Sequence, residues 1–181
     1  MGLTGGCMCG AVRFELASEP FDCGWCHCRT CQLSSGTPAQ AFAAVKRGDW
    51  VPTSGADSIR MIRSSSFGQR YFCGECGTPL YVTVDHQPDT LDFSVVTLDD
   101  PEAVPPEYHI FWSSKIGWFN LDDDLPRHER FRPDTKGLSG TEPPDNSSMT
   151  GGARARGCLP ATAGSGCAAR RRPSARPAAR P

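Results

Sequence analysis

The chain has 181 residues and a formal net charge of −1 at pH 7, which suits one ordinary domain with an additional segment. Residues 1–133 carry 11 basic and 17 acidic side chains, whereas residues 134–181 carry 8 basic and 3 acidic ones. An acidic first part gives no reason to expect a nucleic-acid-binding domain. No apolar stretch approaches the ~18 residues of a membrane span, and residues 1–20 do not resemble a secretory signal. We therefore predict a soluble, cytoplasmic protein.

Short strand-like segments dominate the first part of the chain, separated by clusters of Gly, Pro, Ser and Asp. One helical turn is expected at residues 29–33. Strands are expected, in chain order, at residues 11–16, 39–45, 58–63, 80–84, 91–98 and 107–112. This pattern predicts a mainly β domain over residues 3–133, with its strands in two or more sheets.

Residues 134–181 differ in composition from the rest of the chain. They are rich in Gly, Pro, Ala, Ser and Arg, and large apolar side chains are almost absent after Met149. Such a segment buries too little apolar surface to offset the entropy of ordering it, so we predict a disordered tail. Cys158 and Cys167 lie in it, with no candidate ligands nearby.

Ten cysteines in a chain without a secretory signal favour metal sites over disulfides. Two clusters have matching form: Cys7-Met8-Cys9-Gly10, and Cys73-Gly74-Glu75-Cys76-Gly77. In each, a tight turn places two sulfurs on one side, and the following Gly permits a positive φ. Together the clusters offer four thiolates, so Cys7, Cys9, Cys73 and Cys76 are predicted to form a closed structural zinc site.

A third cluster, Cys26-His27-Cys28-Arg29-Thr30-Cys31, brings three sulfurs together within six residues. Three protein ligands with an open fourth position are typical of catalytic zinc, and a thiolate-rich site suits a sulfur-bearing substrate. Cys23 or His27 could instead supply a fourth ligand and close the site. The residues alone leave these alternatives open.

The cysteine motifs resemble those of the glutathione-dependent formaldehyde-activating enzyme family, which also includes centromere protein V. The motifs are GGCMCGAVRF at residues 5–14, CHCRTC at 26–31 and FCGECGTPL at 72–80, followed by a less specific segment at 110–131. The resemblance covers about residues 3–132. It implies a β-tent fold of small antiparallel sheets and two zinc ions, the second of them accessible to glutathione. The ligands it implies for that second zinc are Cys26, Cys28 and Cys31.

The activity implied by this resemblance joins formaldehyde and glutathione to S-hydroxymethylglutathione, which is a carbon–sulfur lyase reaction in reverse. The partner would be glutathione or another small thiol adduct. A non-catalytic zinc module that binds a protein or nucleic-acid partner remains the alternative function. The four histidines, His27, His86, His109 and His128, receive no catalytic assignment, because a single histidine is more often structural.

Overall fold

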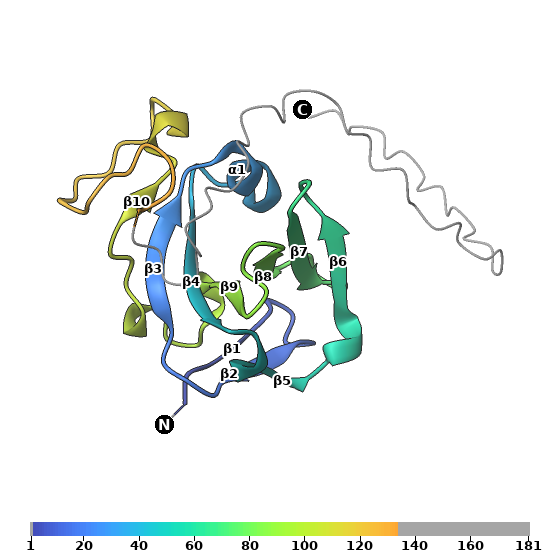
Figure 1. The fold of residues 1–181 in the computed structure, drawn as a ribbon. Coiled ribbons are helices and arrows are strands. Elements are labelled where there is room, and N and C mark those ends of the chain that lie inside the picture. The colour runs from blue at the N-terminus through green and yellow to red at the C-terminus, as the bar shows by residue number, and fades with distance from the viewer. Residues whose placement is uncertain (1, 134–181) are drawn as a thin grey trace, which may run out of the picture. The chain divides into compact units, whose positions relative to one another are not determined.

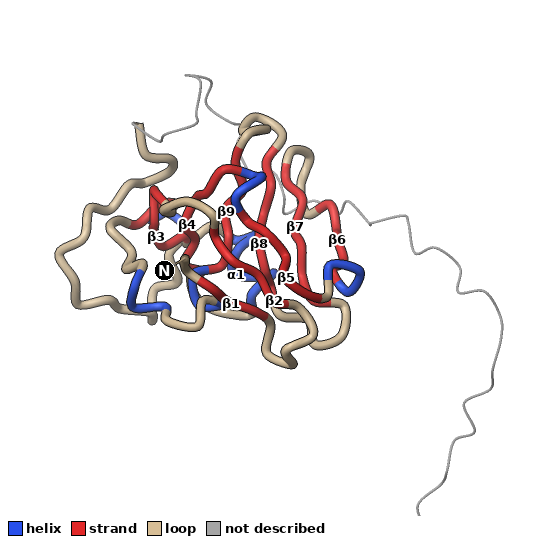
Figure 2. Tube along the Cα trace, turned by 90° about the horizontal axis from the view of Figure 1, so that it is seen from below, coloured by secondary structure: helices blue, strands red, loops and turns tan. Residues whose placement is uncertain are grey.

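The computed structural model describes residues 2–133; the predicted disorder of residues 134–181 falls outside them. Strands dominate this part of the chain, and its helices are short (Figure 2). The mainly β fold expected from the sequence is confirmed.

The smaller of two sheets has three strands, which pair antiparallel in the order β1-β2-β5. They are β1 (Thr4–Gly6), β2 (Arg13–Leu16) and β5 (Trp50–Ser54). Pro52 of β5 pairs with Phe14 beside a shift in register. A proline has no N–H to donate, so its place at an irregularity on an outer strand is the expected one.

The larger sheet has seven strands. In spatial order they are β10 (His109–Ile110), β3 (Phe21–Cys26), β4 (Gln40–Lys46), β9 (Thr90–Ser94), β8 (Pro79–Val84), β7 (Gly68–Cys73) and β6 (Ile59–Arg63). Neighbouring strands are antiparallel except β10 and β3, which are parallel. The smaller sheet and α1 lie at opposite ends of this sheet (Figure 1).

The α-helix α1 (Arg29–Ser35) confirms the helical turn expected at residues 29–33 and ends at Gly36, whose φ is 69°. A left-handed residue after a helix is usually glycine, because a Cβ is disfavoured there. The remaining helices are single 3₁₀ turns: η1 (Arg47–Asp49), η2 (Ala56–Ser58), η3 (Val95–Thr97), η4 (Pro101–Ala103) and η5 (Trp112–Ser114).

Strands with a continuous apolar or a partly alternating pattern were predicted best. The segments expected at residues 39–45, 58–63 and 80–84 correspond to β4, β6 and β8, and β2 occupies the end of 11–16. The strand expected at 91–98 is wrong after Ser94, because Val95–Thr97 form a 3₁₀ turn. Of residues 107–112 only two are in a strand. The pattern does not predict β1, β3, β5 or β7.

One face of the larger sheet packs against the smaller sheet to form the core. Phe14 of β2 stacks on Trp50 of β5 with 4.7 Å between ring centroids, and it approaches Phe93 of β9 at 6.5 Å. Val45 and Leu80 complete this contact from β4 and β8. The opposite face of the same sheet lines a cavity. Since successive side chains of a strand point to opposite faces, neighbours in sequence serve the core and the cavity in turn.

Candidate functional site

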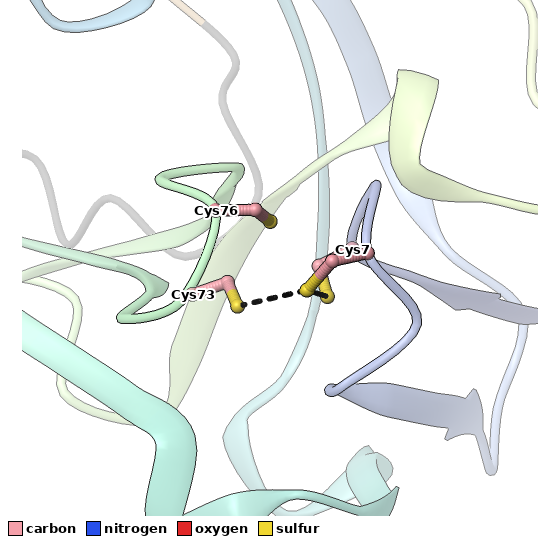
Figure 3. A group of neighbouring side chains, drawn as sticks. Cys7, Cys73 and Cys76 are labelled. Atoms are coloured by element: carbon pink, nitrogen blue, oxygen red, sulfur yellow. Dashed lines mark hydrogen bonds between the residues drawn. The ribbon is translucent and has the colours of Figure 1, made fainter. Parts of the chain in front are cut away.

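Two matching turns bring the four-cysteine cluster together. Cys7 accepts a hydrogen bond at its carbonyl from the N–H of Gly10 at 3.0 Å, and Cys73 accepts one from Gly77 at 2.8 Å. Both glycines have positive φ, 76° and 77°, which the predicted turns require. The first turn joins β1 to β2 and the second joins β7 to β8. Figure 3 shows the sulfurs of Cys7, Cys73 and Cys76 on the facing sides of these turns.

The sulfur positions of this cluster fit a tetrahedral metal ion. The Sγ atoms of Cys7, Cys9, Cys73 and Cys76 all lie within 4.8 Å of one another. Cys7 and Cys9 sulfurs are 3.5 Å apart, and those of Cys9 and Cys73 are 3.9 Å apart. Four sulfurs at Zn–S distances of ~2.3 Å would be separated by about 3.8 Å. A disulfide would need an S–S distance of about 2.05 Å, so these thiols are unbonded.

Hydrogen bonds to the sulfurs favour the thiolate form that binds metal. The N–H of Val12 donates to the sulfur of Cys7 at 3.2 Å. The Thr78 hydroxyl lies 3.1 Å from the sulfur of Cys76, and this contact, with the Thr78 backbone, lowers the pKa of Cys76 to about 6. Backbone and hydroxyl donors around a metal ligand orient it and hold its negative charge.

The three-cysteine cluster forms where β3 meets α1. Cys26 ends β3, Cys28 is the N-cap of α1, and Cys31 lies in the first helical turn. All three thiols are buried, and their sulfurs lie within 4.8 Å of one another. The N–H of Cys31 donates to the Cys28 sulfur at 3.4 Å, so the Cys28 side chain caps the helix.

Arg70 of β7 supplies a positive charge to this cluster. Its Nη2 donates to the Cys31 sulfur at 3.3 Å. The sulfurs of Cys26 and Cys28, together with Arg70, hold the pKa of Cys31 well below its usual range despite burial. Three thiolates at this place would therefore be balanced in part by a guanidinium from a distant strand.

Cys23 does not join the three-cysteine cluster. Its side chain belongs to the core on the opposite face of the sheet, where its sulfur donates to the Val104 carbonyl at 3.3 Å. The odd spacing from Cys26 along β3 accounts for this, because residues three apart on a strand point to opposite faces. Among the described residues, no further Cys, His, Asp or Glu belongs to the cluster.

His27 also points away from the cysteines, into a hydrogen-bonded chain. Its Nε2 lies 3.0 Å from Nδ1 of His109, and Nε2 of His109 lies 3.2 Å from both carboxylate oxygens of Asp123. Both imidazoles are fully buried, and Trp112 packs edge-on against each of them. Burial, followed by His109 and Lys115, lowers the pKa of His27 to about 4, so its ring is neutral.

The contact with Asp123 orients the ring of His109. A carboxylate only accepts hydrogen bonds, so Nε2 of His109 carries the hydrogen that it donates to Asp123. The sequence did not point to this arrangement, because its members are separated by 82 and 14 positions.

A cavity of about 150 Å³ adjoins the three-cysteine cluster. Its wall includes all three sulfur-bearing residues, Arg70, His86 and the aromatic rings of Phe42, Tyr108, Phe111 and Phe131. Asp22 forms an ion pair with Arg132 at one end, and Arg132 lies 4.4 Å over the ring of Tyr108. Among residues 2–133, Asp22 and Phe111 are the non-glycine residues with positive φ, 51° and 56°. Strained backbone of this kind gathers at functional sites, and both residues line the cavity.

The remaining histidines and Trp118 differ in whether they line the cavity. His86 lines the cavity beside Phe67, and His128 packs edge-on against Tyr108. Trp118 is 72% exposed and lies apart from the cavity wall. Within residues 2–133, no helix is long and apolar enough to cross a membrane.

Residues 2–114 match the family model described as glutathione-dependent formaldehyde-activating enzyme. The chain is 28% identical over 129 residues to a Halomonas elongata protein named "Putative glutathione-dependent formaldehyde-activating enzyme", an alignment covering 67% of this chain and 82% of that protein. It is 34% identical over 77 residues to a Schizosaccharomyces pombe protein named an uncharacterized lyase, covering 42% of this chain and 54% of that protein. The crystal structure of a Rhodobacter sphaeroides protein aligns with a TM-score of 0.47 at 22% identity, over 55% of this chain and 93% of that one.

The family match spans more than half of the chain and includes all seven cysteines of the two clusters. The resemblance carried by the cysteine motifs is thereby confirmed, and the chain belongs to the glutathione-dependent formaldehyde-activating enzyme family.

Proposed function

We propose that residues 3–133 form a zinc-binding enzyme domain with one structural and one catalytic zinc ion. The structural ion would be bound by Cys7, Cys9, Cys73 and Cys76, and the catalytic ion by Cys26, Cys28 and Cys31. The observation that carries this proposal is the contrast between the clusters. The first has a full tetrahedral set of sulfurs, whereas the second has three sulfurs beside a cavity.

The proposed reaction is addition of glutathione to formaldehyde, and its reverse is a carbon–sulfur lyase reaction. A zinc ion with three thiolate ligands supplies a position at which a substrate thiol is deprotonated at neutral pH. The glutathione sulfur donates its electron pair to the formaldehyde carbon and forms the C–S bond. The carbonyl π pair moves to oxygen, which takes up a proton and becomes the hydroxyl of S-hydroxymethylglutathione.

The chain's own residues would position and shield this reaction. Arg70 donates to the Cys31 sulfur and offsets the negative charge that a bound thiolate would add. Phe42 and Phe111 cover the cavity with apolar surface, which keeps electrostatic interactions strong by limiting water. The N-terminus of α1 presents its N–H groups beside Cys28 and Cys31, where negative charge is favoured.

Several wider expectations belong to the same proposal. The partner would be a small thiol or thiol adduct, with no nucleic acid bound by the domain, and the location would be the cytoplasm. A non-catalytic zinc module that binds a macromolecular partner is the competing function. The names of the Halomonas and Schizosaccharomyces relatives favour the enzyme.

The test is metal analysis of the full-length chain together with turnover. We expect about two zinc ions per chain, one of them released or perturbed by added glutathione. The zinc-loaded protein should accelerate the loss of free formaldehyde in the presence of glutathione, measured by stopped-flow trapping of the aldehyde.

Cys28→Ser is the matched inactive variant and Cys23→Ser the matched control, because only Cys28 belongs to a cluster. Loss of acceleration in Cys28→Ser alone would support the assignment. Two zinc ions indifferent to thiols, with no acceleration by the wild-type protein, would refute the enzyme and favour the non-catalytic module.

A further inference from the structure

Asp92 occupies an unusual position on the cavity face of the larger sheet. It lies in the middle of β9, where Leu91 and Phe93 on either side point into the core. Its partners across the sheet are Ala44 of β4 and Val82 of β8, and both also line the cavity. A carboxylate among apolar neighbours on an inner strand breaks the local pattern, and such breaks concentrate at functional positions.

No hydrogen-bond donor among the described residues contacts the Asp92 side chain. Within residues 2–133 no hydrogen bond or ion pair is formed by its carboxylate, although the residue is partly buried. Burial is the main reason that its pKa rises to about 6; the negative charges of Cys31 and Asp22 add to this effect, and the positive charge of Arg70 opposes it. A partly buried carboxylate costs free energy unless a donor pairs with it.

The other charged groups of the cavity wall already have partners. Asp22 pairs with Arg132. Arg70 donates to the Cys31 sulfur. The wall thus carries a carboxylate that no donor contacts, in the same cavity as the three thiols, and Arg70 acts on it only through space. A ligand with a cationic hydrogen-bond donor beside Asp92 would form the charged hydrogen bond that no protein group forms with this carboxylate.

We propose that Asp92 binds the α-ammonium group of the γ-glutamyl residue of glutathione. This inference rests on the proposed function, because it concerns the same thiol substrate. It specifies which group of glutathione would contact Asp92 of β9. The ammonium is the single cation of glutathione at neutral pH, and Asp92 offers an acceptor with up to four lone-pair directions. The sulfur and the ammonium would then be held at two points of one cavity, which defines the substrate's orientation.

A two-by-two binding experiment tests this assignment. Isothermal titration calorimetry would compare wild type and Asp92→Asn, each zinc-loaded and full length. The ligands would be glutathione and glutaryl-cysteinyl-glycine, the analogue in which hydrogen replaces the α-amino group. We expect Asp92→Asn to weaken glutathione binding about 10- to 100-fold, as for loss of a charged hydrogen bond. The analogue should bind both proteins equally, with the affinity of glutathione for Asp92→Asn.

Asp89→Asn is the matched control, because it removes the same charge from an exposed position outside the cavity wall. It should leave both affinities unchanged. Thermal unfolding supplies a second readout: Asp92→Asn should be as stable as wild type or more so, since an unpaired carboxylate is removed.

The outcomes separate this inference from the proposed function. Equal weakening of both ligands by Asp92→Asn, or marked destabilisation of that variant, would overturn the ammonium contact and assign Asp92 a structural role. Unchanged glutathione affinity in Asp92→Asn would overturn it too. If wild type binds glutathione but does not accelerate adduct formation, the proposed activity fails while the ammonium contact stands.

Discussion

Replacing Cys9 by serine removes one sulfur from the four-cysteine cluster with little loss of packing, because Cys9 is exposed. The metal at this cluster would close a loop of 64 positions between Cys9 and Cys73. Chain-entropy reasoning for a covalent link gives about 4 kcal/mol for a closure of this length, and about 2 kcal/mol for the short span from Cys26 to Cys31. Since a domain is stable by only about 5–15 kcal/mol, losing the closure between Cys9 and Cys73 would remove a large part of the free energy of unfolding.

Cys28→Ser should be much milder than Cys9→Ser. The serine hydroxyl is a favoured N-cap and can accept the N–H of Cys31 that now donates to sulfur. We therefore expect Cys9→Ser to lower the free energy of unfolding of the zinc-loaded chain by about 4 kcal/mol, and Cys28→Ser by less than about 2 kcal/mol. Cys28→Ser should nevertheless retain about one zinc ion per chain rather than two.

Urea unfolding followed by tryptophan fluorescence measures both losses, with zinc content determined on the same samples. Cys23→Ser is the control for a buried thiol outside both clusters, and its serine can still donate to the Val104 carbonyl. Equal destabilisation by Cys9→Ser and Cys28→Ser would refute the division into a structural and a catalytic site.

Three further changes test other parts of the structure. Asp123→Ala leaves the buried Nε2 of His109 without an acceptor, so it should cost about 1–3 kcal/mol in urea unfolding and speed zinc loss to a chelator. Asp99→Asn should cost at most about 1 kcal/mol near pH 7, because the ion pair with Arg13 is exposed. Arg13 lowers the pKa of Asp99, so this stabilisation is present above the unfolded pKa and disappears as the pH falls through the lower folded value. Phe14→Ala should cost about 3–5 kcal/mol through loss of a buried aromatic ring, measured by urea unfolding.

Each of these expectations has a contradicting result. Asp124→Ala changes the exposed neighbour of Asp123 and should leave the free energy of unfolding unchanged. Equal destabilisation by Asp123→Ala and Asp124→Ala would contradict a special role of the hydrogen bond between Asp123 and His109. A stability difference between wild type and Asp99→Asn that does not shrink as the pH falls below the unfolded pKa of an aspartate would contradict the ion-pair explanation. A loss below about 1 kcal/mol for Phe14→Ala would mean that the core between the sheets collapses around the missing ring.

The prediction of a closed cysteine cluster depended on local features. Each half is a short turn with two cysteines and a following glycine, and both glycines have the positive φ that such turns require. The strands that were predicted correctly share this local character, since β4 and β8 follow a continuous apolar or alternating pattern. The short β10 and the 3₁₀ turn after Ser94 depend on neighbours distant in sequence, so the pattern did not define them.

The sequence by itself determined the family, the mainly β class and the division of seven cysteines into two clusters, because short-range spacing and turn residues encode them. It left open whether Cys23 completes the second cluster. Only the tertiary structure decided this, because the strand pleat directs Cys23 into the core and Cys26 toward the cavity. The same holds for Asp92, whose surroundings come from strand register. It holds also for the hydrogen-bonded series His27–His109–Asp123, which joins segments far apart in sequence.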